Sequence, residues 1–96
     1  MIRLQEIWKF PIEIKEGKHN LFMPDSAEIL TVVEQDKKAA VYALVNPNAK
    51  NQGQRRDFQL FLTGDVVDGD FKRKYIGTFR VKALPQDLVF HLFEIF

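Results

Sequence analysis

Hydrophobic and polar residues alternate along much of the chain, which is typical of β-strands. The clearest case is the stretch IWKFPIEI at 7–14, where apolar side chains take every second position: Trp8, Phe10, Ile12 and Ile14. A period of two places such residues on one face of a strand. Pro11 has no N–H to donate to a neighbour, so this strand is expected to lie at a sheet edge or to break near Pro11.

The next segments predict a turn and a hairpin. Residues 15–20 (KEGKHN) are expected to form a turn, and 21–24 (LFMP) a short strand. Apolar runs at 29–34 and 41–45 flank the sequence DKKA and predict a hairpin whose two faces are both partly buried. A helix capped by Asp25 or Ser26 is the alternative, but the β-branched residues after it favour a strand.

The second half of the chain repeats the pattern of strands and loops. Strands are predicted at 56–64, 75–81 and 88–96, with loops at 47–54 and 65–74. Gly77 lies inside a predicted strand, which indicates a bulge or a close backbone approach. Six or seven short strands predict a single mainly β domain over residues 1–96, built as a small antiparallel sandwich or barrel.

The last predicted strand, LVFHLFEIF, is apolar on both of its faces. Leu88, Phe90, Leu92 and Phe96 alternate with a second set: Val89, His91, Phe93 and Ile95. A domain of 96 residues has little chain to cover both faces. The second set is therefore predicted to form a subunit interface of a homo-oligomer, with His91 as a structural or interface residue.

Composition narrows the classes of function. The chain has no cysteine, which excludes disulfides and thiolate metal sites, and a net charge of +1 that disfavours nucleic acid as a partner. Gln5, Glu6 and Lys9 interrupt any signal-peptide core, and no segment is apolar enough for a membrane span.

Catalytic and metal-binding signatures are missing from the sequence. Ser26 is the only serine and has no glycine-flanked nucleophile motif around it. Asp65, Asp68 and Asp70 lack the spacing of a calcium loop, so Asp68-Gly69 is interpreted as a turn. We therefore expect no enzyme activity, no catalytic residues, no metal site and no cofactor.

Basic residues predict one anion-binding surface. If the strands at 56–64 and 75–81 pair as a hairpin, the start of the first lies beside the end of the second. That pairing would gather one set of cations at one end of the molecule: Lys50, Arg55, Arg56, Arg80 and Lys82. Arginine suits phosphate oxygens, whereas the alternative is a solvated rim that only aids solubility.

Five motifs in order resemble a family of small uncharacterised bacteriophage and prophage proteins: IWKFPIEI, AEILTV, YALVNPNA, YIGTF and LVFHLFE. The resemblance implies an accessory protein in the host bacterial cytoplasm. The predicted function is a non-catalytic binding module that counters host defence by sequestering a nucleotide-like anion or blocking a host protein. The alternative is a structural or assembly component of the virion.

Overall fold

The computed structural model describes residues 4–83 and 85–96. These residues form seven strands and no helix: β1 (Glu6–Ile12), β2 (Gly17–Met23), β3 (Glu28–Gln35), β4 (Lys38–Val45), β5 (Gln54–Leu62), β6 (Arg73–Ala83) and β7 (Gln86–Ile95). The prediction of a small antiparallel β domain of six or seven strands is confirmed. Within the described part of the chain, no helix is long and apolar enough to cross a membrane.

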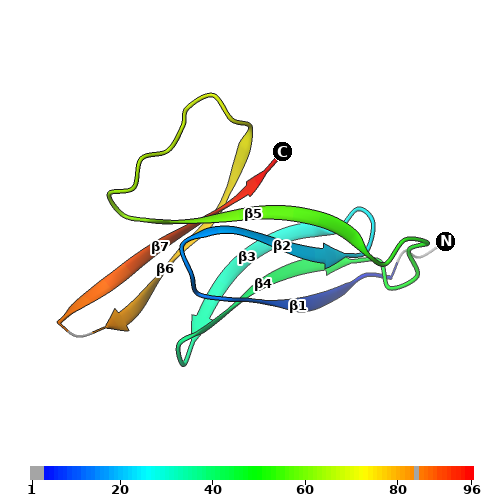
Figure 1. Cartoon of the computed structure of the whole chain (residues 1–96). Coiled ribbons are helices and arrows are strands. Elements are labelled where there is room, and N and C mark those ends of the chain that lie inside the picture. The colour runs from blue at the N-terminus through cyan, green and yellow to red at the C-terminus, as the bar shows by residue number, and fades with distance from the viewer. Residues whose placement is uncertain (1–3, 84) are drawn as a thin grey trace.

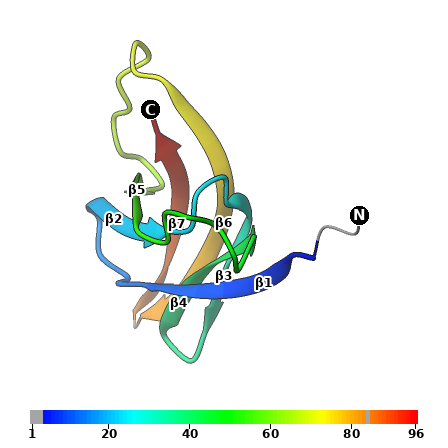
Figure 2. The same cartoon turned by 90° about the vertical axis from the view of Figure 1, so that its right-hand side faces the viewer.

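The strands form two antiparallel sheets that pack as a sandwich. One sheet has three strands in the order β1-β4-β3, and the other has four in the order β2-β5-β7-β6. Figure 1 shows the β6–β7 and β3–β4 hairpins projecting at the lower left, and Figure 2 shows β1 crossing in front of the lower parts of β6 and β7. The molecule therefore measures 53 × 34 × 18 Å rather than being spherical.

The alternation in the sequence accounts for the core between the sheets. In β4, every second side chain is buried against the other sheet, from Ala39 to Val45. Phe58 and Leu60 of β5 and Leu92 of β7 meet them from the four-stranded sheet and are fully buried. Burying apolar surface is the main stabilising term in such a small sandwich.

Two local predictions in the first sheet are confirmed. β1, which contains Pro11, is an edge strand paired only with β4. β3 and β4 form the predicted hairpin, closed by Asp36 and Lys37, both with positive φ of 53° and 63°. That geometry identifies a type I′ turn, whose twist matches that of the flanking strands.

Gly77 marks both a bulge and a close approach, as its position in the sequence predicts. The register between β6 and β7 shifts between Tyr75 and Gly77. A Cβ at Gly77 would lie 3.0 Å from Cγ1 of Val32 in β3. A glycine here lets the edges of the two sheets close against each other.

Two predictions about neighbours and boundaries are wrong. Residues 17–20, expected in a turn, begin β2, because His19 and Leu21 alternate with exposed residues and pair with β5. β5 does not pair with β6. β7 lies between them and is antiparallel to both, so β5 and β6 run parallel. The loop at 63–72 must therefore cross from the end of β5 back to the start of β6 (Figure 2).

Candidate functional site: the outer face of the four-stranded sheet

The outer face is the side of the β2-β5-β7-β6 sheet that points away from the other sheet. Strand register places five cations on it, contributed by three of its strands: Lys18, Arg55, Arg73, Arg80 and Lys82. Two carboxylates share the face, Asp57 and Asp87. The strands thus carry more cations than carboxylates on this face, whereas the loop at 63–72 adds Asp65, Asp68, Asp70 and Lys72 beside it.

An aromatic cluster occupies the middle of this face. Phe61 of β5 packs edge-on against Phe93 of β7, with ring centroids 5.7 Å apart, and Tyr75 of β6 lies 5.5 Å from Phe93. Phe71 folds back from the loop and stacks on Phe61 at 6.4 Å, with the guanidinium of Arg73 5.0 Å above its ring. The loop at 63–72 is therefore a partial cover over the sheet.

His91 links this cover to the sheet through hydroxyl groups. Its Nε2 lies 2.7 Å from Oγ1 of Thr63, and its Nδ1 lies 3.0 Å from Oγ1 of Thr78. Thr78 also shares a 2.5 Å hydrogen bond with the hydroxyl of Tyr75. A catalytic histidine is usually oriented by a carboxylate, whereas both partners of His91 are threonines, so the geometry favours a structural role.

The four predicted interface residues, Val89, His91, Phe93 and Ile95, run along the middle of the outer face on β7. All four are half-buried rather than fully open. Aromatic packing and the loop cover account for Phe93 and His91 within the single chain. Their role as a subunit interface therefore stays a prediction.

The predicted meeting of five cations at one end is wrong. Because β5 and β6 run parallel, Asp57 lies level with Arg73, not with the end of β6. Arg80 and Lys82 lie at the opposite end of the sheet from Arg55. Lys50 lies elsewhere, in the loop between β4 and β5, where it lines a hollow of about 630 Å³.

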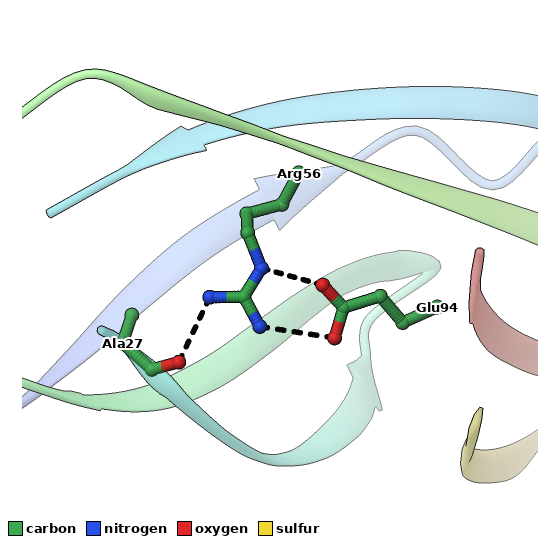
Figure 3. Close-up of polar contacts among 3 residues, drawn as sticks. All are labelled: Ala27, Arg56 and Glu94. Atoms are coloured by element: carbon green, nitrogen blue, oxygen red, sulfur yellow. Dashed lines mark hydrogen bonds and ion pairs between the residues drawn. The ribbon is translucent and has the colours of Figure 1, made fainter. Parts of the chain in front are cut away.

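Arg56 points inward and is bound within the protein. Its Nε and Nη2 donate to the carboxylate of Glu94 on β7 at 2.5 and 3.0 Å, and its Nη1 donates to the carbonyl of Ala27 at 2.8 Å (Figure 3). The side chains are only 18% and 4% exposed for Arg56 and Glu94. The bidentate ion pair joins β5 to β7 within the four-stranded sheet, and the hydrogen bond to Ala27 connects this sheet to the segment that leads into β3.

The cations on the outer face differ in how they are engaged. Arg55 lies 2.9 Å from Asp57, and Arg80 lies 3.7 Å from Asp87, and all four side chains are well exposed. Exposed pairs of this kind contribute little to stability and exchange readily with solvent or a ligand. Within the described residues, Lys18 makes no ion pair.

The hollows near this face are open and mixed in charge. The largest, about 920 Å³, lies at the end of the sandwich and includes Arg56, Glu94, Lys74 and Glu28 in its lining. A smaller one of about 200 Å³ lies between Lys18, Asn20 and Arg55. Small-molecule sites are usually concave and largely apolar, so this surface better suits an extended ligand.

Acidic residues in the covering loop serve its turns. Oδ2 of Asp65 accepts the N–H of Leu62 at 2.8 Å, and Oδ1 of Asp68 accepts the N–H of Asp70 at 2.9 Å. These bonds agree with the interpretation of this segment as a turn. The described residues contain no group of three or more His, Cys, Asp or Glu placed to hold a metal ion.

Asp65 also connects the loop to the segment between β1 and β2. Its side-chain hydrogen bond with Glu16 raises the pKa of Glu16, and the same bond lowers the pKa of Asp65. A proton held between the two carboxyls on Glu16 explains the opposite directions. Glu16 is exposed to solvent and Asp65 is half-buried.

Sequence reasoning missed Lys18, Arg73 and Tyr75 as members of the same face. Arg80 and Lys82 share a face by simple alternation in the sequence. Tyr75 joins them only because the bulge before Gly77 shifts the register by one residue. The predicted bulge was the signal that could have placed Tyr75 correctly.

The protein is therefore a small antiparallel β-sandwich with an open sheet face on which the strands present five cations. The chain belongs to the DUF7352 family, described as a domain of unknown function, whose family model matches residues 4–95. No curated protein and no solved structure matches the chain.

Proposed function

We propose that this protein is a non-catalytic binding module that holds an acidic ligand against the outer face of its four-stranded sheet. The observation that carries the proposal is the sorting of charge. The strands place five cations and two carboxylates on this face, and both carboxylates are already close to an arginine. The three aspartates of the covering loop lie beside its middle, so the cations nearest the sheet ends, Lys18, Arg55, Arg80 and Lys82, are the ones that attract the ligand. Complementary charge steers binding and selects partners, so the fitting ligand is acidic.

The shape of the face supports an extended ligand over a small one. The hollow on the face itself, between Lys18 and Arg55, is only about 200 Å³, below the usual range of small-molecule sites, roughly 300–1,000 Å³. The hollow of about 920 Å³ at the end of the sandwich is large enough, but carboxylates line it together with the arginines. The cations lie at both ends of the sheet, so a single nucleotide would not reach all of them. A polymer or another macromolecule would.

The resemblance to phage and prophage proteins supplies context for this proposal. In an infected bacterium, the acidic ligand would be a host component that the module sequesters or blocks. This context concerns which ligand is available in the cell, whereas the geometry concerns only its charge and extended shape.

The test uses a defined probe, a peptide of ten glutamates, titrated into ¹⁵N-labelled protein. We expect chemical-shift changes on the outer-face residues of β2, β5, β6 and β7. The double variant Lys18→Glu with Lys82→Glu should bind at least several-fold more weakly. The matched control, Lys9→Glu with Lys38→Glu, reverses two lysines on the opposite outer face and should leave binding unchanged.

Two results would contradict the proposal. One is the absence of shift changes at millimolar peptide in low salt. The other is equal weakening by both double variants, because that would show a response to net charge rather than to this face.

A further inference from the structure

The outer side of β6 carries cations and an aromatic ring in one line. Arg73, Tyr75, Thr78, Arg80 and Lys82 all face outward, and we call this set the β6 stripe. The bulge between Tyr75 and Gly77 keeps Tyr75 and Thr78 on the same side although they are three residues apart. At about 3.3 Å per residue, the stripe is roughly 26 Å long.

Tyr75 is held in place with much of its ring open to solvent. It is 54% exposed, while its hydroxyl is bonded at 2.5 Å to Thr78 on the same strand. Its ring tilts by 60° against Phe93, which supports it from β7. Thr78 is itself fixed by His91 at 3.0 Å. The ring is therefore pre-organised, which lowers the entropic cost of stacking something on it.

We propose that the β6 stripe binds single-stranded nucleic acid, with a base stacked on Tyr75 and backbone phosphates on Arg73, Arg80 and Lys82. Proteins that bind single strands combine aromatic platforms with cations that follow the backbone. An acidic peptide would use the cations but would gain nothing specific from the ring. This inference rests on the proposed function and names the chemical class of its ligand.

On the sequence alone, the net charge of +1 disfavoured nucleic acid as a partner. The fold, however, distributes the charges unevenly over the surface. Nucleic-acid binding depends on the local field of the contacted surface rather than on the total charge. Arg73 stands before the ring along β6, where its Nη1 also donates to the carbonyls of Asp68 and Phe71, which leaves its other N–H groups for a phosphate. Arg80 and Lys82 stand after the ring. A strand laid along β6 would therefore meet cations on both sides of the stacked base.

The experiment measures fluorescence anisotropy of labelled twelve-nucleotide oligo-dT and oligo-U with the intact protein. With three phosphates neutralised, log K should fall with log salt at a slope of about −2. Tyr75→Leu keeps apolar packing on Phe93 but removes the ring, and it should weaken binding about tenfold. Tyr75→Phe keeps the ring and should lose less.

Matched controls separate this stripe from the rest of the surface. Tyr42→Leu removes a tyrosine from the outer face of the other sheet and should not change binding. Arg73→Glu and Lys82→Glu should each make the salt dependence shallower. Circular dichroism of each variant checks that the fold is retained.

The outcomes distinguish this inference from the proposed function. If the glutamate peptide binds but the oligonucleotides do not, or if Tyr75→Leu binds them as well as the unmodified protein, the nucleic-acid inference is wrong and the acidic-ligand proposal stands. Equal affinity for duplex DNA would also overturn it, because stacked duplex bases cannot reach Tyr75. If neither probe binds, both proposals fail.

Discussion

At Gly77, the backbone of β6 lies close against β3 of the other sheet. Replacing Gly77 with Ala would place a methyl group 3.0 Å from Cγ1 of Val32, which is buried. We expect Gly77→Ala to lower the free energy of unfolding by about 1–3 kcal/mol, the usual cost of overpacking. Urea denaturation measures it.

Two further variants test the cause of that loss. Val32→Ala removes the methyl group that clashes, so the double variant should be more stable than the two single losses predict. Gly69→Ala has no atom within 4 Å of the new methyl group and should not be destabilising. Equal losses for Gly77→Ala and Gly69→Ala would contradict the steric explanation.

Removing only one member of the Arg56–Glu94 ion pair is expected to lower the free energy of unfolding substantially. Arg56→Met would leave the carboxylate of Glu94 buried without its guanidinium. Removing one member of a buried pair typically costs about 3–5 kcal/mol. We therefore expect a large drop in the urea midpoint for Arg56→Met and a smaller one for Arg56→Met with Glu94→Leu. A double variant less stable than the single one would argue against this account.

At the scale of elements, the β3–β4 turn contains a residue whose backbone conformation lowers the stability of the fold. Lys37 has a φ of 63°, and the left-handed conformation costs a non-glycine residue about 1–2 kcal/mol. Lys37→Gly should therefore raise the free energy of unfolding by about 1 kcal/mol, seen as a higher melting temperature. Lys37→Ala keeps the strain and should give no such gain.

The loop at 63–72 should respond to pH through Glu16 and Asp65. The raised pKa of Glu16 stabilises the folded state fully below its ordinary value of 4.5, and this contribution is lost as pH rises through the raised pKa. The lowered pKa of Asp65 stabilises it above 3.8, and this is lost as pH falls through the lowered pKa. The attachment of the loop is therefore strongest near pH 4.

Glu16→Gln tests this behaviour, because an amide can donate to Asp65 at any pH. Melting temperatures of Glu16→Gln and the unmodified protein should agree near pH 4 and separate in favour of Glu16→Gln by pH 7. Glu13→Gln removes a nearby charge without touching Asp65 and serves as the control. A constant difference between pH 4 and pH 7 would show that the shared proton plays no part.

The strands themselves were largely predictable, whereas their neighbours were not. Alternation identified β1 and β5 because each has one face in the core, and runs of apolar and β-branched residues identified β6 and β7. The first half of β2 was taken for a turn because Gly17, Lys18 and Asn20 resemble one in composition, whereas its second half was predicted as the short strand at 21–24. The alternation of apolar and polar residues does not indicate which strands are neighbours in a sheet. The position of β7 between β5 and β6 was therefore not predicted.

Because the sequence pattern does not reveal strand pairing, only part of the site could be predicted. Both sequence-based sites contributed residues to one face: Arg55, Arg80 and Lys82 from the anion hypothesis, and the outward side of β7 from the interface hypothesis. Arg56 differs because its partner, Glu94, is distant in the sequence and close only after folding. Local patterns assign side chains to faces, and long-range pairing decides which cations remain available.

At the scale of the whole molecule, the two outer faces differ in character. The strands of the three-stranded sheet expose apolar side chains, including Ile7 at 63%, Leu30 and Val33. Val33 also lines a hollow of about 510 Å³ beside Ala40. Two copies would repel each other through their cation-rich faces. The three-stranded sheet is therefore a second surface through which self-association is expected, while the interface on β7 stays a prediction.

Sedimentation equilibrium between about 10 and 300 µM tests this expectation. The unmodified protein should show a rising average mass, and Val33→Glu should remove the rise. Lys18→Glu, on the other outer face, should leave the association intact or strengthen it. A monomer over the whole range would contradict the expectation of a homo-oligomer.

The central place of β7 also has a consequence for how the chain is made. During synthesis, β5 and β6 emerge before the strand that pairs with both of them. Until β7 arrives, each lacks a hydrogen-bonding neighbour that the finished sheet provides, and such edges invite aggregation. Contacts distant in sequence also form slowly. The four-stranded sheet can therefore form only after the ten residues of β7 have been synthesised. A nascent chain truncated before β7 is expected to remain unfolded.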